Sequence, residues 1–446
     1  MERKLIVIFL ILFCGRLLVR YLLQQLNIRN LHRHGKEIPK VFEGHIDVAI
    51  LNRMVDYTSD LSRLQSEENL ASDITELAVV LLLLPVLVGW LLGIHLHPIG
   101  QALFFFAILA LISGLAGLPF EIRRTFVLER KSGFSNMTWK LWLMDLAKSV
   151  ILSAILMGLI VVALMGFVIY LPNHWWFWGW MFFTVFQLLL LWIYPVLIAP
   201  IFNKFEPIQD EALKEKIMDM LSKAGLEANG IYQVDEGKRS KHTNAYFTGV
   251  GKTRRIVLYD TLLSSHMPEE IVSILAHEIG HWKKKHILKQ LVFMISASFV
   301  LFYAIFQVVS WPTFFSAFRI GQMPVYAGFF LASLYFAAAG FFLRPIGAAI
   351  TRRFEYEADR MAFDLTGSSQ PMISALKRLA RDNLSNLHPH PWYVLFYYSH
   401  PPLVERIEYL QTMDYKKTIL GRAANARTGK DDVVNGPLSG VEASKM

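Results

Sequence analysis

The sequence predicts a mainly α-helical, multi-pass membrane protein, with about seven transmembrane helices and one small α+β insert on the cytoplasmic side. Apolar residues make up 54% of the 446-residue chain and charged residues make up 18%, against about 25% in a typical soluble domain. Seven apolar runs are long enough to cross a hydrocarbon layer of about 30 Å. A polar stretch with both helix and strand patterns separates the fifth run from the sixth.

The N-terminal region, residues 1–200, contains five of the predicted spans. The first begins at Leu5 and is interrupted by Arg16 and Arg20, whose long side chains we expect to reach the membrane interface. A signal peptide is the alternative for this run, but no small-residue cleavage site follows it. The other four spans are Leu77–Leu96, Ala102–Phe120, Val150–Leu171 and Trp175–Ile201.

The region 291–345 contains two further spans, Leu291–Trp311 and Val325–Leu343. Loops rich in lysine and arginine alternate along the chain with loops that are poor in them. The loop 121–140 is rich in both residues, whereas the turns after the second and fourth spans contain neither. Because cytoplasmic loops are enriched in these residues, the N-terminus is expected outside and the C-terminus in the cytoplasm. The same loops account for the net charge of +9, so we expect no nucleic-acid partner.

The polar insert, residues 201–290, is predicted as a small α+β unit. It begins with an amphipathic helix over Asp210–Ala224. Glycines between the last two of the β-prone runs that follow indicate a hairpin. These runs are Ile231–Val234, Ala245–Thr248 and Arg255–Tyr259, and the glycines are Gly249 and Gly251.

A second helix of the insert begins at Pro268, a residue suited to the first helical turn, and carries His277-Glu278-Ile279-Gly280-His281. Histidines four residues apart share one helix face, so both imidazoles can bind one zinc ion. Glu278 lies close enough to take a proton from an attacking water. The pattern is short and needs supporting residues, above all a third protein ligand for the metal.

The region 346–420 supplies the candidate for this third ligand, in the segment Arg352–Asp359. On a helix, Glu355 and Asp359 share a face, whereas Glu357 lies about 200° around the axis from Glu355. We therefore expect Glu355 to complete a site for one zinc ion per chain, and Asp359 to accept a hydrogen bond from a ligand imidazole. The alternative is that these acids pair with the neighbouring arginines at the membrane surface.

With these residues the chain resembles the Ste24-type CAAX prenyl protease 1 proteins, which are integral-membrane zinc metalloproteases of the M48 family. The matching stretches cover nearly the whole chain in the expected order, and together they are far more specific than the five-residue motif. They are Phe126–Phe134, Asn244–Phe247, Arg255–Thr261, Ala276–Trp282, Arg352–Asp359 and Ser399–Arg406.

The resemblance implies roles for residues outside the zinc motif. His400 would donate a hydrogen bond to the oxyanion that forms during hydrolysis, and Arg406 would pair with an acid behind the zinc ligands. The seven helices would enclose a polar, water-filled cavity that admits a lipidated peptide. That peptide would lie along an open strand edge formed by Asn244, Ala245, Tyr246 and Phe247.

The sequence thus predicts a zinc endopeptidase that cleaves near the C-terminus of prenylated (CAAX-type) or other membrane-associated peptides, with Glu278 as general base. One alternative is a broad-specificity quality-control metalloprotease of the membrane. Another is a non-catalytic metal-binding membrane protein or transporter, which would have no need of Glu278. The expected partners are a peptide or protein substrate and membrane lipid.

The expected location is the endoplasmic reticulum membrane in a eukaryote, or the inner or plasma membrane in a bacterium, with the active site facing the cytoplasm. The tail, residues 421–446, is mixed in charge and rich in small and polar residues. Such a composition cannot bury enough apolar surface to order a chain, so the tail is predicted to be disordered.

Overall fold

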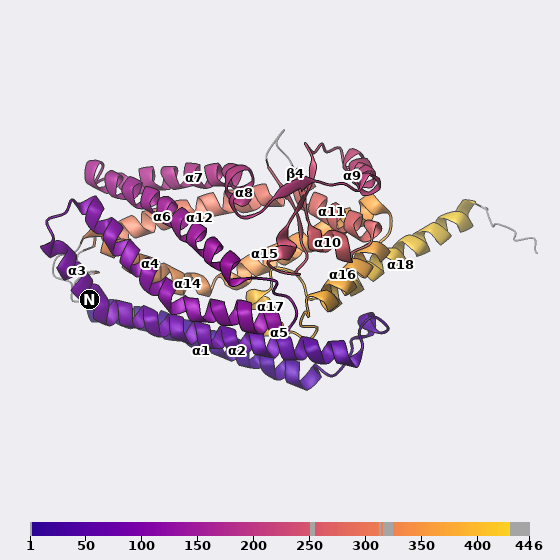
Figure 1. Cartoon of the computed structure of the whole chain (residues 1–446), viewed down its shortest axis with the longest axis horizontal. Coiled ribbons are helices and arrows are strands. Elements are labelled where there is room, and N and C mark those ends of the chain that lie inside the picture. The colour runs from indigo at the N-terminus through magenta and orange to yellow at the C-terminus, as the bar shows by residue number, and fades with distance from the viewer. Residues whose placement is uncertain (1, 250–254, 312–313, 315–323, 429–446) are drawn as a thin grey trace, which may run out of the picture.

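The structure is a computed structural model of the chain and describes residues 2–249, 255–311, 314 and 324–428 (Figure 1). It confirms the predicted fold class, because long helices dominate and a small sheet lies in the insert. Among the described residues, six helices are long and apolar enough to cross a membrane. A seventh crossing results if Val325–Phe341 and Arg344–Thr366, which are bent by 57°, count as one span.

The second span differs most from its prediction. Its helix begins at Val48, where Asp47 caps the N-terminus by accepting a hydrogen bond from Ile50 N at 2.7 Å. The prediction, Leu77–Leu96, covered only the apolar part of this region. The polar residues before Leu77 belong to the same helix, but they form no apolar run and so were not predicted. The N-terminal helices are α1 (Glu2–His34), η1 (Lys40–Phe42), α2 (Val48–Ala78), η2 (Val79–Leu83), α3 (Leu84–Gly93), α4 (Pro98–Arg123), η3 (Arg124–Leu128), α5 (Glu129–Lys131), α6 (Trp139–Tyr170), α7 (Trp175–Ile193), η4 (Tyr194–Ile198) and α8 (Ala199–Phe202).

Arg16 and Arg20 lie between α1 and α2 and pair with acids of α2. Arg16 Nη2 is 2.9 Å from Glu76 Oε2 and 3.3 Å from Asp73 Oδ1. Arg20 pairs with the other oxygen of Asp73, whose side chain is only 7% exposed. Charges inside a helix bundle pair with one another because unpaired charges are costly there. The arginines therefore join two spans, and their position at the membrane interface stays a prediction.

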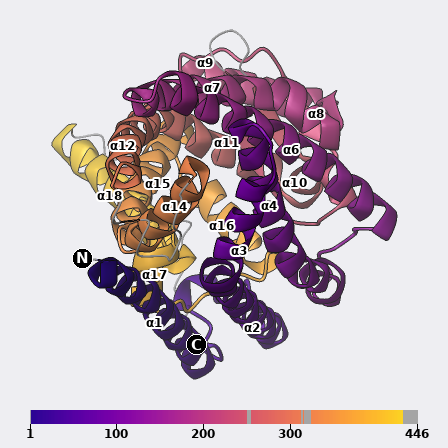
Figure 2. The same cartoon turned by 90° about the vertical axis from the view of Figure 1, so that its left-hand side faces the viewer.

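The spanning helices form a closed ring in which each one contacts the next: α1, α2, α4, α6, α7, α12 (His286–Val309), α14 (Val325–Phe341) and again α1 (Figure 2). Burial within the most apolar windows ranges from 6% in α12 and 11% in α1 to 33% in the helix Val48–Gly93. Helices packed around a filled core would bury one face more completely. Tight packing is concentrated instead in one cluster, which includes Leu84, Leu91, Phe105 and Tyr326.

The insert folds around a four-stranded sheet, and three of its strands coincide with the predicted β-prone runs. The missed strand, β1, has only three residues and ends at Pro207, so it carries no alternating pattern. The edge strand β3 pairs antiparallel with β4, as a hairpin requires, although its turn, 250–254 with Gly251, lies outside the described residues. The strand order is β1 (Phe205–Pro207), β2 (Ile231–Val234), β4 (Arg255–Tyr259) and β3 (Ala245–Thr248).

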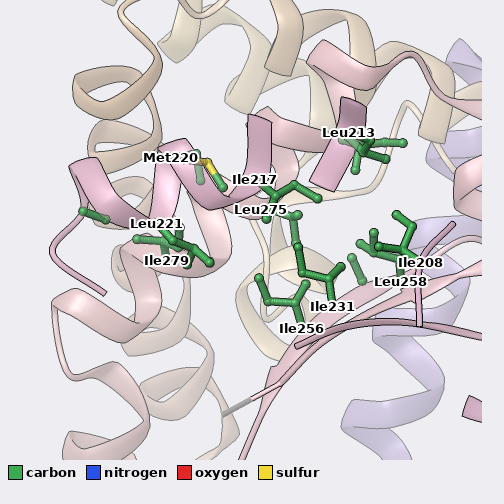
Figure 3. Packing of buried hydrophobic residues seen from close by; sticks show 14 of the residues in the cluster. Ile208, Leu213, Ile217, Met220, Leu221, Ile231, Ile256, Leu258, Leu275 and Ile279 are labelled. Carbon is green, nitrogen blue, oxygen red and sulfur yellow. The ribbon is translucent and has the colours of Figure 1, made fainter. Parts of the chain in front are cut away.

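A hydrophobic core between the sheet and two helices fixes the zinc-motif helix (Figure 3). The helices of the insert are α9 (Glu211–Lys223), η5 (Glu236–Lys238), α10 (Asp260–Ser265) and α11 (Pro268–Lys283), so the second predicted helix does begin at Pro268. Ile217 of α9, Ile256 of β4 and Ile279 of α11 are fully buried there. Because Ile279 lies about 160–200° around the helix from both motif histidines, burying it turns the two imidazoles to the opposite side.

The C-terminal region packs against α11 and completes the site. Its helices are α15 (Arg344–Thr366), α16 (Gln370–Asp382), α17 (Pro391–Tyr397) and α18 (Leu403–Thr428). Both α15 and α16 contact α11, and α18 contacts α15 and α16. Since α18 continues to Thr428, the first part of the predicted disordered tail is helical. Residues 429–446 lie outside the described chain.

Candidate active site

The two motif histidines approach each other on one face of α11. Their Nε2 atoms are 3.1 Å apart, and the ring planes are nearly perpendicular at 74°. His277 is buried, whereas the side chain of His281 is 21% exposed. Two ring nitrogens at this distance can share one proton or one metal ion.

Glu355 of α15 brings a carboxylate to the same point. Its Oε2 atom lies 3.3 Å from His277 Nε2, and its Oε1 atom lies 3.1 Å from His281 Nε2. The Oε2 atom is buried without a hydrogen-bond partner, although the residue as a whole is 5% exposed. Ligand atoms bound tetrahedrally to zinc at about 2.0–2.1 Å lie about 3.3 Å from one another. The three separations therefore fit a zinc ion held by His277, His281 and Glu355.

Gly280 explains how α15 can come so close to α11. A Cβ atom at this position would lie 2.8 Å from Ala358 Cα and 2.9 Å from the Ala358 carbonyl oxygen. Real Cβ atoms essentially never approach other atoms this closely, so only glycine permits the contact. The crossing point lies one turn from Glu355, and it sets the distance between that carboxylate and the histidines.

Asp359 and Arg406 support His277 at its Nδ1 atom. Asp359 Oδ1 is 2.8 Å from His277 Nδ1, and Arg406 donates from Nε and Nη2 to the two Asp359 oxygens at 2.7 Å each. All three side chains are buried. A bidentate arginine keeps the carboxylate ionised. An imidazole that donates from Nδ1 to a carboxylate presents its Nε2 lone pair to a metal.

Glu278 faces a small cavity of about 140 Å³. Burial raises the pKa of its carboxyl above the usual range, while the neighbouring imidazoles of His277 and His281 oppose that rise. A base is most effective when its pKa lies near the working pH. The cavity is lined by Thr243, Asn244, Ala245, Leu262, Ile274, His277, Glu278, Glu355, Met372, Leu376, Leu379, His400 and Arg406.

His400 reaches the cavity from the segment before α18. Its Nε2 lies 3.4 Å from Glu355 Oε1, and its side chain is 64% exposed. The Ser399 Oγ atom is 2.9 Å from His400 Nδ1. When the Ser399 hydroxyl donates to Nδ1, the ring proton remains on Nε2, on the side of the cavity. The sequence analysis quoted Ser399 only within a matching stretch and gave it no role.

The predicted substrate strand lies partly at the cavity. Asn244 and Ala245 line it, whereas Tyr246 and Phe247 continue along β3 and are not among its lining residues. Within the described sheet β3 pairs only with β4, so its other side is free of a strand partner. Asn244 Oδ1 accepts a hydrogen bond from Ala245 N at 2.8 Å, which fixes its amide at the start of the edge.

Two residues beside the site were missed by the sequence analysis. His286 was given no role there, and Glu357 was placed on the helix face away from Glu355. The structure places His286 Nδ1 3.1 Å from His281 Nδ1, and His286 Nε2 3.2 Å from Glu357 Oε2. No spacing rule could have found this contact, because five residues along a continuous helix correspond to about 140° of rotation.

Comparisons with known proteins agree with this geometry. Residues 27–204 match the family described as "CAAX prenyl protease N-terminal, five membrane helices", and residues 207–414 match "Peptidase family M48". CAAX prenyl protease 1 of Saccharomyces cerevisiae is 32% identical in an alignment 412 residues long that covers 85% of this chain and 90% of the yeast protein. The Homo sapiens CAAX prenyl protease 1 homolog is 30% identical over 71% of this chain and 75% of its own length.

A solved structure gives the same result. The crystal structure of S. mikatae Ste24p superposes with a TM-score of 0.83 at 30% sequence identity, and the match covers 90% of this chain and 99% of that one. The agreement extends over the membrane helices and the insert together, because both regions fall within the aligned length. The chain therefore belongs to peptidase family M48 and, within it, to the membrane-embedded CAAX prenyl proteases of type 1.

Proposed function

We propose that this protein is a zinc-dependent membrane endopeptidase that cleaves near the C-terminus of prenylated, CAAX-type peptides. The observation that carries the proposal is the convergence of His277, His281 and Glu355 beside Glu278 and the free edge of β3. Three ligand atoms within 4.8 Å of one another suit one metal ion, and imidazole with carboxylate is a donor set that zinc accepts. When bound, zinc supplies Lewis acidity toward water and the scissile carbonyl.

The other roles in hydrolysis belong to residues of this chain. Glu278 takes a proton from the attacking water and passes it to the leaving amine. His400 donates from Nε2 to the carbonyl oxygen as negative charge develops there. The backbone of Ala245 and its neighbours in β3 aligns the peptide as an added strand. Asp359 and Arg406 keep His277 in one orientation and one tautomer.

The prenylated substrate is supported by the names of the yeast and human relatives, CAAX prenyl protease 1 and its homolog. The closed ring of helices and its low burial leave room for the expected polar chamber. The basic loops favour an active site on the cytoplasmic side. In a eukaryotic cell we place the protein in the endoplasmic reticulum membrane, and in a bacterium in the inner or plasma membrane.

A matched pair of peptides tests the substrate class. Purified protein is incubated with a farnesylated CAAX peptide and with its unmodified twin, and the released C-terminal fragment is quantified. We expect the farnesylated peptide to be cleaved with the higher kcat/KM, and we expect zinc chelation to abolish cleavage and added zinc to restore it. Equal cleavage of both peptides would favour the broad-specificity alternative. Cleavage that survives complete removal of zinc would contradict the proposal itself.

A further inference from the structure

The two zinc-motif imidazoles have different supports. His277 Nδ1 meets the carboxylate of Asp359 directly, at 2.8 Å. His281 Nδ1 instead meets another imidazole, because His286 Nδ1 lies 3.1 Å away. His286 Nε2 in turn lies 3.2 Å from Glu357 Oε2. The support of His281 is therefore a chain of two groups.

The ring protons in this chain have one consistent arrangement. His281 Nε2 faces Glu355 Oε1 at 3.1 Å, so a metal held there leaves the His281 ring proton on Nδ1. That N–H donates to His286 Nδ1, which must then be unprotonated. The His286 ring proton consequently lies on Nε2 and is donated to Glu357. The carboxylate thus selects the His286 tautomer that can accept from His281.

The fold holds His286 firmly in this position. The residue is 1% exposed, and its ring stacks on Phe354 with centroids 4.1 Å apart and planes 8° from parallel. Helix α11 ends at Lys283, and Lys285 adopts a left-handed conformation with φ of 58° before α12 begins at His286. This costly turn for a non-glycine residue lets His286 fold back against His281.

Helix α15 then provides three acids to one site. Glu355 faces both imidazoles, Asp359 meets His277, and Glu357 reaches His281 through His286. The other oxygen of Glu357, Oε1, accepts a hydrogen bond from Arg353 Nε at 3.2 Å, so the carboxylate is held by Arg353 as well as by His286. The side chain of Glu357 is 31% exposed, so the chain of contacts ends near the surface.

We propose that His286 and Glu357 are positioning residues that orient His281 for metal binding, through the hydrogen-bond chain from Glu357 to His286 and from His286 to His281. This inference rests on the proposed zinc site. Groups that hydrogen-bond a ligand imidazole typically change metal affinity by about 10- to 100-fold when they are removed. Neither residue is among those that line the cavity beside Glu278.

The test measures zinc affinity in the full-length protein in detergent, by competition with a chromophoric chelator. His286→Phe keeps the stacked ring but removes the acceptor, and Glu357→Met removes the terminal acceptor. We expect each to weaken zinc binding by about 10- to 100-fold. His286→Asn and Glu357→Gln retain an acceptor oxygen and should stay within about threefold of wild type. Asp364→Asn, which removes another acid from α15, is the matched control and should change nothing.

Two further readouts separate positioning from simple structural damage. Because Glu357 acts through His286, adding Glu357→Met to His286→Phe should cause no further loss of zinc affinity. The visible spectrum of the cobalt-substituted protein should change in His286→Phe and should be restored in His286→Asn. Wild-type zinc affinity and an unchanged cobalt spectrum in His286→Phe would overturn the inference. So would equal losses in His286→Phe and His286→Asn with a lowered melting temperature of the metal-free protein.

The same measurement distinguishes failure of this inference from failure of the proposed function. If wild-type protein binds no stoichiometric zinc, the metal site itself is wrong. If wild type binds one zinc ion and the His286 and Glu357 variants bind it equally tightly, the metal site stands and the positioning roles are wrong.

Discussion

Glu355 meets four other side chains of the site, since both imidazoles, His400 and Arg406 lie within 3.6 Å of its oxygens. Glu357, two residues away, reaches the site only through His286. The two acids on the same helix therefore offer a sharp comparison between a metal ligand and a supporting group.

Glu355→Ala should abolish stoichiometric zinc binding, because two imidazoles alone do not complete a catalytic site. Glu357→Gln is the control and should retain about one zinc ion per chain. Metal content of the purified variants is measured by atomic emission. Loss of zinc in the Glu357 variant with retention in the Glu355 variant would show that the ligand assignment is wrong.

His400→Ala should lower kcat by about a hundredfold while zinc content stays unchanged, since the lost hydrogen bond forms with the oxygen that gains charge. Ser399→Ala is the companion variant, because it removes the hydroxyl beside His400 Nδ1 while leaving the imidazole in place. We expect a smaller loss of kcat there. If zinc falls together with activity in His400→Ala, the residue is a metal ligand and not an oxyanion donor.

At the scale of elements, the site depends on how closely α11 and α15 cross. Gly280→Ala places a Cβ atom 2.8 Å from Ala358 Cα, so the two helices must separate by several tenths of an ångström or more. We expect weaker zinc binding, a lower melting temperature and activity below one-tenth of wild type, roughly the scale of a misplaced catalytic group. The matched control is Gly347→Ala on α15, where an added Cβ meets nothing within 4 Å. Unchanged zinc affinity in Gly280→Ala would contradict the close-crossing argument.

His242 ties the start of β3 to two other elements. Its Nε2 is 3.3 Å from Glu129 Oε2 of α5, its Nδ1 is 2.8 Å from Asn383 Oδ1 after α16, and its ring lies against Phe134. The Glu129 carboxylate raises the pKa of His242. Burial lowers this pKa, and the hydrogen bond with Asn383 raises it further. Both ring nitrogens then donate to oxygen acceptors when the imidazole is protonated.

This raised pKa gives a pH dependence with a definite sign. A group whose pKa is higher in the folded state stabilises the fold fully below its unfolded pKa of about 6.5, and that contribution is lost as the pH rises through the folded pKa. His242→Gln should therefore lower the melting temperature more at pH 6 than at pH 9. Lys241→Gln, an exposed neighbour, should show no such difference. An equal loss at both pH values would mean that protonation of His242 adds nothing to stability.

The elements that the sequence predicted well are those with a local signal. Three strands of the insert match their β-prone runs, and α11 begins at Pro268 as predicted. The fold-back of His286 depends on the left-handed turn at Lys285, a residue with no preference for that conformation. The pairing of Arg16 with Asp73 joins residues 57 positions apart. Neither has a signature in sequence, because both arise from contacts between elements.

At the scale of the whole molecule, the membrane helices and the peptidase insert form one working unit. Glu278 on α11 and Glu355 on α15 meet across chain segments that are separated by α12 and α14. The seven-helix ring contacts the insert directly, since α11 of the insert leads into α12 and packs against it. Apolar runs predicted the spans, whereas the ring closure depends on helix pairing that no run reveals.

Glu278→Gln tests the assignment of a metal-dependent peptidase most directly. The substitution keeps the shape and a hydrogen-bond acceptor but cannot take a proton. We predict that the purified variant retains about one zinc ion per chain and cleaves the farnesylated CAAX peptide at least about a hundredfold more slowly than wild type. Turnover close to wild type in the zinc-loaded variant would contradict the mechanism, because Glu278 could then not be the base that activates water.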